Sequence, residues 1–283
     1  MRKILVPLDG SKLSDRILDQ VRRILVREDA EVRLLTVMPP AGYEPSPAER
    51  RTVAQIQSHL ADHREALVAQ GATVTTAALV YGDAAEKILD YAGKYRPSLI
   101  AMSTHGRTGI KRWTRGSVAE RVLRHSPFPL LLWNPFHPGR TDGQGGRIST
   151  ILVPLDGSQR AARILPLVRE MALDFSARVV LLHVTELYPT VGDVPVLLPP
   201  PSPAQIARQM APFRKSLRGV SVRIRSELGT PAGSILETAK REKADLIAMA
   251  THGRSGVSRW AFGSVAEQVL RHCPYPLLMQ RVV

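Results

Sequence analysis

The sequence predicts an α/β protein of two tandem doubly wound domains, each a five-stranded parallel sheet flanked by helices. Three observations predict this fold class: the chain repeats itself once, short apolar runs alternate with amphipathic stretches, and glycine-bearing loops follow the apolar runs. Strands and helices in strict alternation form a parallel sheet through right-handed crossover connections.

The repeat defines the domain organisation. Residues 4–11 (ILVPLDGS) recur unchanged as residues 151–158, and the offset between the two copies stays constant along the chain. A repeating unit of this size can close its own core, so we expect two duplicated domains and not a solenoid. We place these domains at 1–135 and 148–283. The segment 136–147, rich in Gly, has the composition of a linker.

Hydrophobic periodicity places the elements of the first half, and the second half repeats them. Apolar runs predict strands at 3–8, 31–37, 73–80, 98–103 and 129–133, and amphipathic stretches predict helices at 12–27, 47–70, 84–95 and 117–125. Residues 99–102 are apolar in succession, which is typical of a strand covered on both faces. Asp83 and Thr230 each follow a glycine and are positioned to cap the next helix.

Composition limits the classes of function. The chain has 39 Lys and Arg residues against 25 Asp and Glu residues, a net charge of +14 that favours anionic partners. Because this excess is spread over both halves with no basic arm, we do not expect nucleic-acid binding. No stretch approaches the roughly 18 apolar residues of a membrane span, and no signal segment is recognisable, so we expect a cytoplasmic protein. We interpret the single cysteine, Cys273, as a structural thiol.

A glycine-bearing loop follows the fourth predicted strand of each half. Residues 103–109 read STHGRTG and residues 250–256 read ATHGRSG, each followed by a Gly-Ser pair before the next helix. Main-chain amides of such loops and the start of a helix favour phosphate. Asp9 and Asp156 follow the first strand, where a carboxylate suits a ribose hydroxyl or a phosphate-bound Mg²⁺ ion. Asp9 could instead serve only to cap the helix after Ser11.

Gly106, Gly116 and Ser117, together with Asp9, resemble the pattern of the universal stress protein family. ATP-binding members of that family carry an aspartate after the first strand and G-x2-G-x9-G-[ST] after the fourth. The resemblance covers both halves, so the chain looks like a tandem member with a Rossmann-like fold of the adenine nucleotide alpha hydrolase-like type. Ser103 and Ala250 replace the family's first glycine, which puts affinity in doubt if the site needs a positive φ there.

The resemblance implies one nucleotide-binding site in each half. Main-chain groups of the second strand would meet the adenine, the aspartate would meet the ribose or Mg²⁺, and the glycine loop would hold the phosphates. In the first half the implied residues are Pro7, Asp9, Val37, Met102, Ser103, Gly106, Arg107, Gly109, Gly116, Ser117 and Val118. In the second half they are Pro154, Asp156, Val184, Met249, Ala250, Gly253, Arg254, Gly256, Gly263, Ser264 and Val265. We expect no catalytic residue and no direct protein cage for a metal.

The leading hypothesis is a stress-response module that binds ATP or a related adenine nucleotide with Mg²⁺. Two alternatives stay open: a slow nucleotide-dependent hydrolase or transferase, and a module that works through protein contacts without nucleotide. The final strands, 129–133 and 276–280, are expected at sheet edges, which proteins pair or cover. The two halves would then associate as an intramolecular pseudo-dimer, and a homodimer is a further option.

A histidine pair lies outside this pattern. His59 and His63 are four residues apart on a predicted helix, so they share one face, as in metal-binding pairs. Their counterparts in the second half are Ile206 and Met210. An apolar pair at these positions favours a packing face over a metal site.

Overall fold

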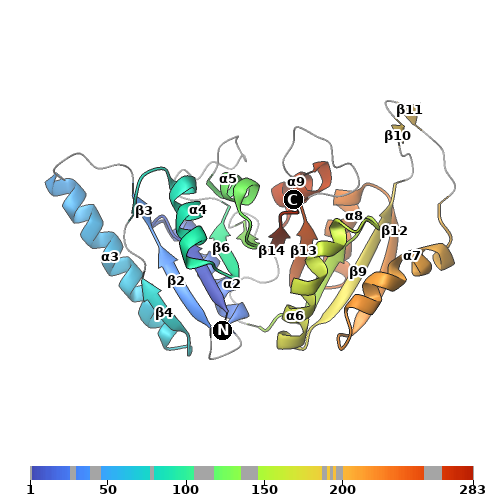
Figure 1. Ribbon diagram of the computed structural model, residues 1–283, viewed down its shortest axis with the longest axis horizontal. Helices are drawn as coiled ribbons and strands as arrows, with labels where there is room; N and C mark the ends of the chain where they lie inside the picture. Colours follow the sequence, from blue (N-terminus) through green and yellow to red (C-terminus); the bar gives the residue numbers. More distant parts are fainter. Residues whose placement is uncertain are drawn as a thin grey trace. The chain divides into compact units, whose positions relative to one another are not determined.

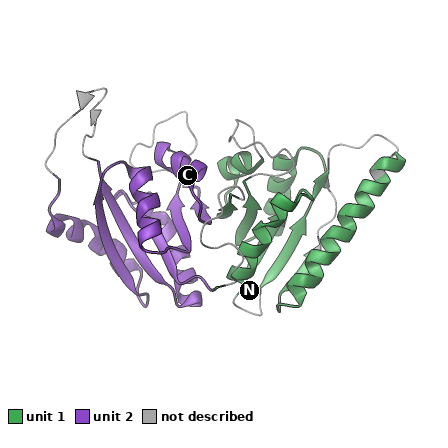
Figure 2. Cartoon of the chain, turned by 180° about the vertical axis from the view of Figure 1, so that it is seen from behind, with its two compact units in different colours: residues 1–138, 142–146 green, residues 139–141, 147–283 purple. Residues whose placement is uncertain are grey.

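The chain forms two compact units, residues 1–138 with 142–146 and residues 139–141 with 147–283 (Figure 2). The computed structural model describes residues 2–25, 30–38, 46–76, 80–104, 118–134, 146–186, 190–191, 194–195, 200–251 and 263–282. No helix in these described ranges combines the length and the apolar character needed to cross a bilayer.

Unit 1 is a parallel sheet with its helices packed around it (Figure 1). Its elements are β1 (Lys3–Pro7), α1 (Lys12–Asp15), α2 (Ile17–Ile24), β2 (Glu31–Leu35), β3 (Val37–Met38), α3 (Pro47–Val68), β4 (Thr73–Thr76), β5 (Val80–Tyr81), α4 (Ala84–Tyr95), β6 (Leu99–Ser103), α5 (Val118–His125) and β7 (Leu130–Trp133). Within the unit the strand order is β7-β6-β1-β2-β4, and β3 pairs separately with β5. Every residue of β6 and β7 is buried, as predicted for strands covered on both faces.

Unit 2 repeats this arrangement. Its elements are β8 (Thr150–Pro154), the 3₁₀ helix η1 (Ala161–Ile164), α6 (Leu165–Phe175), β9 (Arg178–Thr185), β10 (Thr190–Val191), β11 (Val194–Pro195), α7 (Pro203–Ser216), β12 (Val222–Leu228), α8 (Pro231–Arg241), β13 (Leu246–Ala250), α9 (Ser264–His272) and β14 (Leu277–Gln280). The strand order is β12-β9-β8-β13-β14, with all described pairs parallel. The predicted fold class, two tandem doubly wound α/β domains, is therefore confirmed.

Local differences from the predicted elements occur near the strand ends. The predicted strand 31–37 is interrupted at Thr36, so β2 and β3 are separate, whereas β9 continues unbroken to Thr185. The predicted helix 12–27 is divided at Arg16 into α1 and α2. The short antiparallel pair β10 and β11 was not predicted from the sequence.

The two predicted caps differ in chemistry. Asp83 caps α4, because its Oδ1 accepts a hydrogen bond from the Glu86 amide at 3.0 Å, and its Oδ2 accepts one from Arg121 Nη1 at 2.8 Å. Thr230 occupies the N-cap position of α8 but makes no side-chain cap bond. Pro231, at the first turn of α8, has a φ that suits a helix start without this bond.

A matching turn precedes the last strand of each unit. Cys273 Sγ donates to the Tyr275 carbonyl oxygen at 3.3 Å, and at the equivalent position Ser126 Oγ donates to the Phe128 carbonyl oxygen at 3.0 Å. Cys273 is 1% exposed, and this burial raises the pKa of its thiol to about 12. The interpretation of Cys273 as a structural thiol is thus supported by its surroundings.

We predict that replacing Asp83 with Ala lowers the free energy of unfolding by about 1 kcal/mol at neutral pH, through loss of the cap. The hydrogen bond from Arg121 lowers the pKa of Asp83. The contribution of ionised Asp83 is therefore complete above the pKa of an unfolded aspartate and is lost as pH falls through the lower folded-state pKa. Urea titrations at neutral and acidic pH should show the variant and the wild type converging in acid. Thr230→Ala is the matched control, because Thr230 makes no side-chain cap bond. An equal decrease in its free energy of unfolding would show that the cap bond of Asp83 is not the cause.

We also predict that native Cys273 does not react with a thiol reagent at neutral pH, because the thiolate is scarce and buried. Reaction should begin only in denaturant. Since Ser126 fills the equivalent turn in unit 1, Cys273→Ser should keep the fold, as measured by circular dichroism. Rapid labelling of Cys273 in the folded wild type would show that its thiol is accessible, which contradicts this prediction.

Candidate functional site

The first and fourth strands lie side by side in each unit. β1 pairs with β6 through Ile4 and Leu99. In unit 2, β8 pairs with β13 through Ile151 and Leu246. The first strand also pairs with the second strand on its other side, so the strand order reverses at this point. The first and fourth strands are therefore neighbours at the switch point of each unit, and such a point is where open α/β sheets bind ligands.

A short loop after β1 fixes the Asp9 carboxylate. Asp9 Oδ1 accepts hydrogen bonds from the Ser11 amide at 2.9 Å and the Ser11 hydroxyl at 2.6 Å. Ser11 is itself the N-cap of α1, since its Oγ accepts from the Ser14 amide at 3.1 Å. Gly10 turns the chain with a φ of 77°, a value that favours glycine. Asp9 therefore braces the capping residue and is not the helix cap.

The loop after β8 has the same construction. Asp156 Oδ1 accepts from the Ser158 amide at 2.9 Å, and Ser158 Oγ accepts from the Ala161 amide at 3.1 Å. Gly157 has a φ of 84°. Pro7 and Pro154 are the last residues of β1 and β8, directly before these loops. The two units thus hold one half-buried carboxylate each, in the same local geometry.

The predicted second-strand residues are half-buried in both units. Val37 pairs with Val80 in the short β3–β5 ladder, and Val184 pairs with Glu227 of β12. The residues just before them, Thr36 and His183, are buried and were missed by sequence reasoning. His183 Nδ1 donates to the Leu155 carbonyl oxygen at 3.2 Å, directly before Asp156. The sequence offered one signal for these two residues. Side chains alternate between the two faces of a predicted strand, so residues 36 and 183 are expected on the opposite face from Val37 and Val184.

The two non-glycine residues of the predicted loop pattern end regular strands. Ser103 is the last residue of β6 and Ala250 the last residue of β13. Neither is among the described residues with a positive φ. The residues Met102 and Met249 precede them and are buried. Ser103 and Ala250 therefore do not need the positive φ that would disfavour a residue other than glycine at these positions.

The start of α9 lies against the end of β13. Gly263 is the N-cap of α9 with a φ of 74°, and a Cβ at this position would lie 3.3 Å from the Thr251 carbonyl oxygen. Gly263 has no side chain that could accept from the first amides of α9. Ser264 is exposed, and Val265 is half-buried, like Val118 at the start of α5. These amides and the helix dipole form an anion-attracting end beside the strand.

The other predicted loop residues lie outside the described part of the chain. They are Gly106, Arg107, Gly109, Gly116, Ser117, Gly253, Arg254 and Gly256. Their role in holding phosphates stays a prediction.

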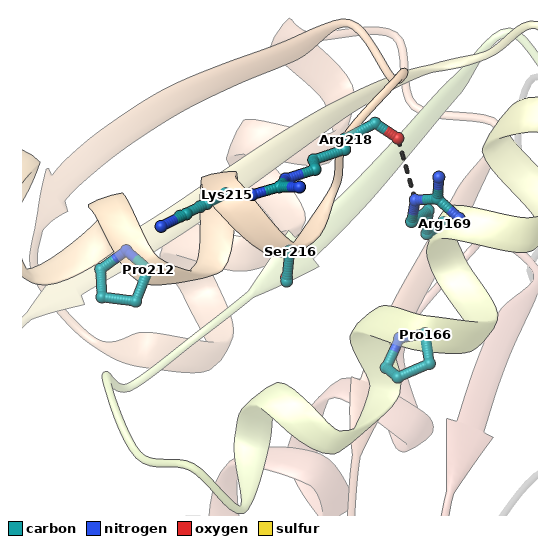
Figure 3. Close-up of a pocket in the computed structure, with 6 residues that line it drawn as sticks. All are labelled: Pro166, Arg169, Pro212, Lys215, Ser216 and Arg218. Atoms are coloured by element: carbon teal, nitrogen blue, oxygen red, sulfur yellow. Dashed lines mark hydrogen bonds between the residues drawn. The ribbon is translucent and has the colours of Figure 1, made fainter.

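A pocket of about 620 Å³ lies elsewhere in unit 2, between α6 and the end of α7. It is lined by Pro166, Arg169, Pro212, Lys215, Ser216 and Arg218 (Figure 3). Arg169 Nε donates to the Arg218 carbonyl oxygen at 2.9 Å, which ties α6 to the turn after α7. None of the lining residues belongs to the predicted nucleotide-binding set, so this pocket is separate from the candidate site.

Comparisons with known proteins identify the family. The model of the universal stress protein family matches residues 1–133 and 147–281. A universal stress protein of Mycolicibacterium smegmatis is 25% identical over 98% of this chain and 96% of its own length. One from Methanocaldococcus jannaschii is 32% identical over 44% of this chain and 78% of its own length.

The comparison with solved structures agrees on the fold. The crystal structure of a universal stress protein from Archaeoglobus fulgidus superposes with a TM-score of 0.73 and 22% identity, covering 99% of this chain and 96% of its own. Since the family model matches both segments, one in each unit, the chain belongs to the universal stress protein family as a tandem member.

Proposed function

We propose that each unit binds ATP, or a closely related adenine nucleotide, together with Mg²⁺, and that the protein acts as a stress-response binding module. The observation that carries this proposal is the adjacency of the first and fourth strands in both units. It brings the Asp-Gly-Ser loop and the beginning of the glycine-bearing segment to the same edge of the sheet, at the switch point where nucleotides bind in such folds.

The aspartates are suited to the sugar or the metal. Ser11 fixes one oxygen of Asp9 through two hydrogen bonds, and Ser158 fixes the equivalent oxygen of Asp156 through its amide. A carboxylate oriented in this way can accept from a ribose hydroxyl without reorganising. Mg²⁺ prefers oxygen ligands and commonly binds through one or two carboxylates plus substrate phosphates. In this proposal Mg²⁺ would offset the charge of the phosphates near Asp9 and Asp156.

The phosphates would lie at the starts of α5 and α9. In unit 2 the first amides of α9 follow Gly263, which brings no side chain of its own to cap them. The positive end of the helix dipole stabilises a negative charge at this position. The net charge of +14 also favours an anionic ligand. Val37 and Val184, at the second strand, would contribute main-chain groups to the adenine.

We predict that equilibrium dialysis with labelled ATP and Mg²⁺ gives two nucleotides per chain. Replacing Asp9 or Asp156 with Ala should each weaken one site about tenfold or more, a loss typical of a hydrogen bond to a charged group. Asp19→Ala is the matched control, because Asp19 is an exposed aspartate paired with Arg22 on α2. Absence of binding at millimolar ATP would refute the proposed function. Phosphate release faster than about one per minute in the same samples would favour an enzyme over a binding module.

A second prediction addresses the helix start in unit 2. Gly263→Ala should reduce the stoichiometry from two nucleotides to one, because a Cβ is strained at a φ of 74° and meets the Thr251 carbonyl oxygen. Gly93→Ala is the control: Gly93 lies in α4, and a Cβ there meets no atom within 4 Å. Unchanged stoichiometry in a folded Gly263→Ala protein would show that the phosphates do not bind at this helix start.

A further inference from the structure

Two helices of unit 1 bring together a carboxylate and two imidazoles that are not among the proposed nucleotide contacts. Asp15 ends α1, and His59 and His63 lie one turn apart on α3. His59 Nε2 lies 3.0 Å from Asp15 Oδ2 and 3.2 Å from His63 Nε2. His63 Nε2 lies 3.5 Å from Asp15 Oδ1. The sequence suggested only the histidine pair, because the contact with Asp15 arises from tertiary packing.

These separations match the ligand shell of a small metal ion. Zinc lies about 2.0–2.2 Å from nitrogen and oxygen ligands in tetrahedral sites, so its ligand atoms are about 3.3 Å from one another. The two imidazole Nε2 atoms are 3.2 Å apart, and Asp15 approaches them with different oxygens, Oδ2 at 3.0 Å from His59 and Oδ1 at 3.5 Å from His63. An ion bound to both Nε2 atoms and to one or both oxygens of Asp15 could therefore contact all three side chains with only small adjustments of their positions.

The hydrogen bonding of the cluster is incomplete without an additional partner. Asp15 Oδ1 is buried and accepts no hydrogen bond from the described residues, although His63 Nε2 lies 3.5 Å from it. A neutral imidazole carries a single N–H, so a hydrogen bond between the two facing Nε2 atoms requires one of them to be without a proton. A buried carboxylate oxygen that accepts no hydrogen bond is costly. A cation would accept lone pairs from this oxygen and from both imidazoles at once.

Unit 2 shows that the fold does not require these polar groups. The equivalent positions are Ala162, Ile206 and Met210, and the last two are buried core residues, 6% and 0% exposed. In unit 1 the side chains of Asp15, His59 and His63 are 14%, 32% and 20% exposed, which leaves solvent access to the cluster. The sequence favoured a packing face at these positions. Unit 2 has such a face, whereas unit 1 has a polar, accessible cluster at the same place.

We propose that Asp15, His59 and His63 bind one divalent transition-metal ion, with Zn²⁺ as the best match to the ligand set. Imidazole and carboxylate suit zinc, and three protein ligands leave a fourth position for water. The ion would join α3 to α1, the helix capped by the Ser11 that also orients Asp9. Metal bound at this point would stabilise unit 1 because the assembled site exists only in the folded chain.

The test uses the full chain without an affinity tag, stripped with a chelator and titrated calorimetrically with Zn²⁺. We expect one high-affinity ion per chain and an increase in melting temperature on binding. The double variant His59→Ile with His63→Met, which copies unit 2, should lose more than about a hundredfold in affinity, and Asp15→Ala at least about tenfold. His272→Ala, an exposed histidine at the end of α9, is the control that should bind as the wild type does.

A spectroscopic measurement on the wild type makes the result independent of the variants' folding. Co²⁺ at a four-coordinate site of nitrogen and oxygen ligands gives strong visible absorption, which Zn²⁺ should abolish by displacement. Wild-type affinity in the folded double variant would overturn the proposal. So would the absence of Zn²⁺ binding and Co²⁺ absorption in the wild type at about 100 µM metal.

Discussion

Each unit depends on the burial of its first strand between two parallel neighbours. Ile4, Leu5 and Val6 of β1 are fully buried, and the identical run Ile151–Val153 of β8 is buried to the same extent. This strand pairs with the second strand on one side and the fourth on the other. The connection after the first strand and the connection after the fourth strand therefore leave the sheet in opposite directions. The site at that edge therefore follows from the same packing that forms the core.

A comparison of equivalent positions in the two units shows which residues differ and which are identical. Beside the sheet of unit 1, Arg33 stacks over the ring of Tyr95 with 4.3 Å between its guanidinium carbon and the ring centroid. The counterpart of Tyr95 is Glu242, which is 4% exposed and receives a hydrogen bond from Arg225 at 2.6 Å. Burial alone would raise the pKa of Glu242, but this hydrogen bond and the nearby arginines outweigh it and lower the pKa. An aromatic stack in one unit thus corresponds to a buried glutamate paired with exposed arginines in the other, while the Asp-Gly-Ser loops are the same in both units.

Much of this architecture could be predicted from local sequence. The predicted helix 84–95 coincides with α4, and the parallel pairing of the strands followed from the alternation of apolar and amphipathic segments. The interruption at Thr36 could not be predicted, because its counterpart His183 lies within a continuous strand and the local apolar pattern is similar. The approach of Asp15 to His59 likewise depends on how α1 and α3 pack, which periodicity does not encode. Asp9 and Asp156 could be assigned to loops after the first strand of each half, because apolar runs predict the ends of β1 and β8.

The most direct test of the central claim is a crystal structure of the chain with ATP and Mg²⁺. The account predicts a nucleotide at the edge where β8 and β13 end, with its phosphates at the first amides of α9 and Asp156 at the ribose or the metal. An equivalent nucleotide should lie beside Asp9 in unit 1. A nucleotide bound instead among Arg169, Lys215 and Arg218, with both strand edges empty, would contradict it.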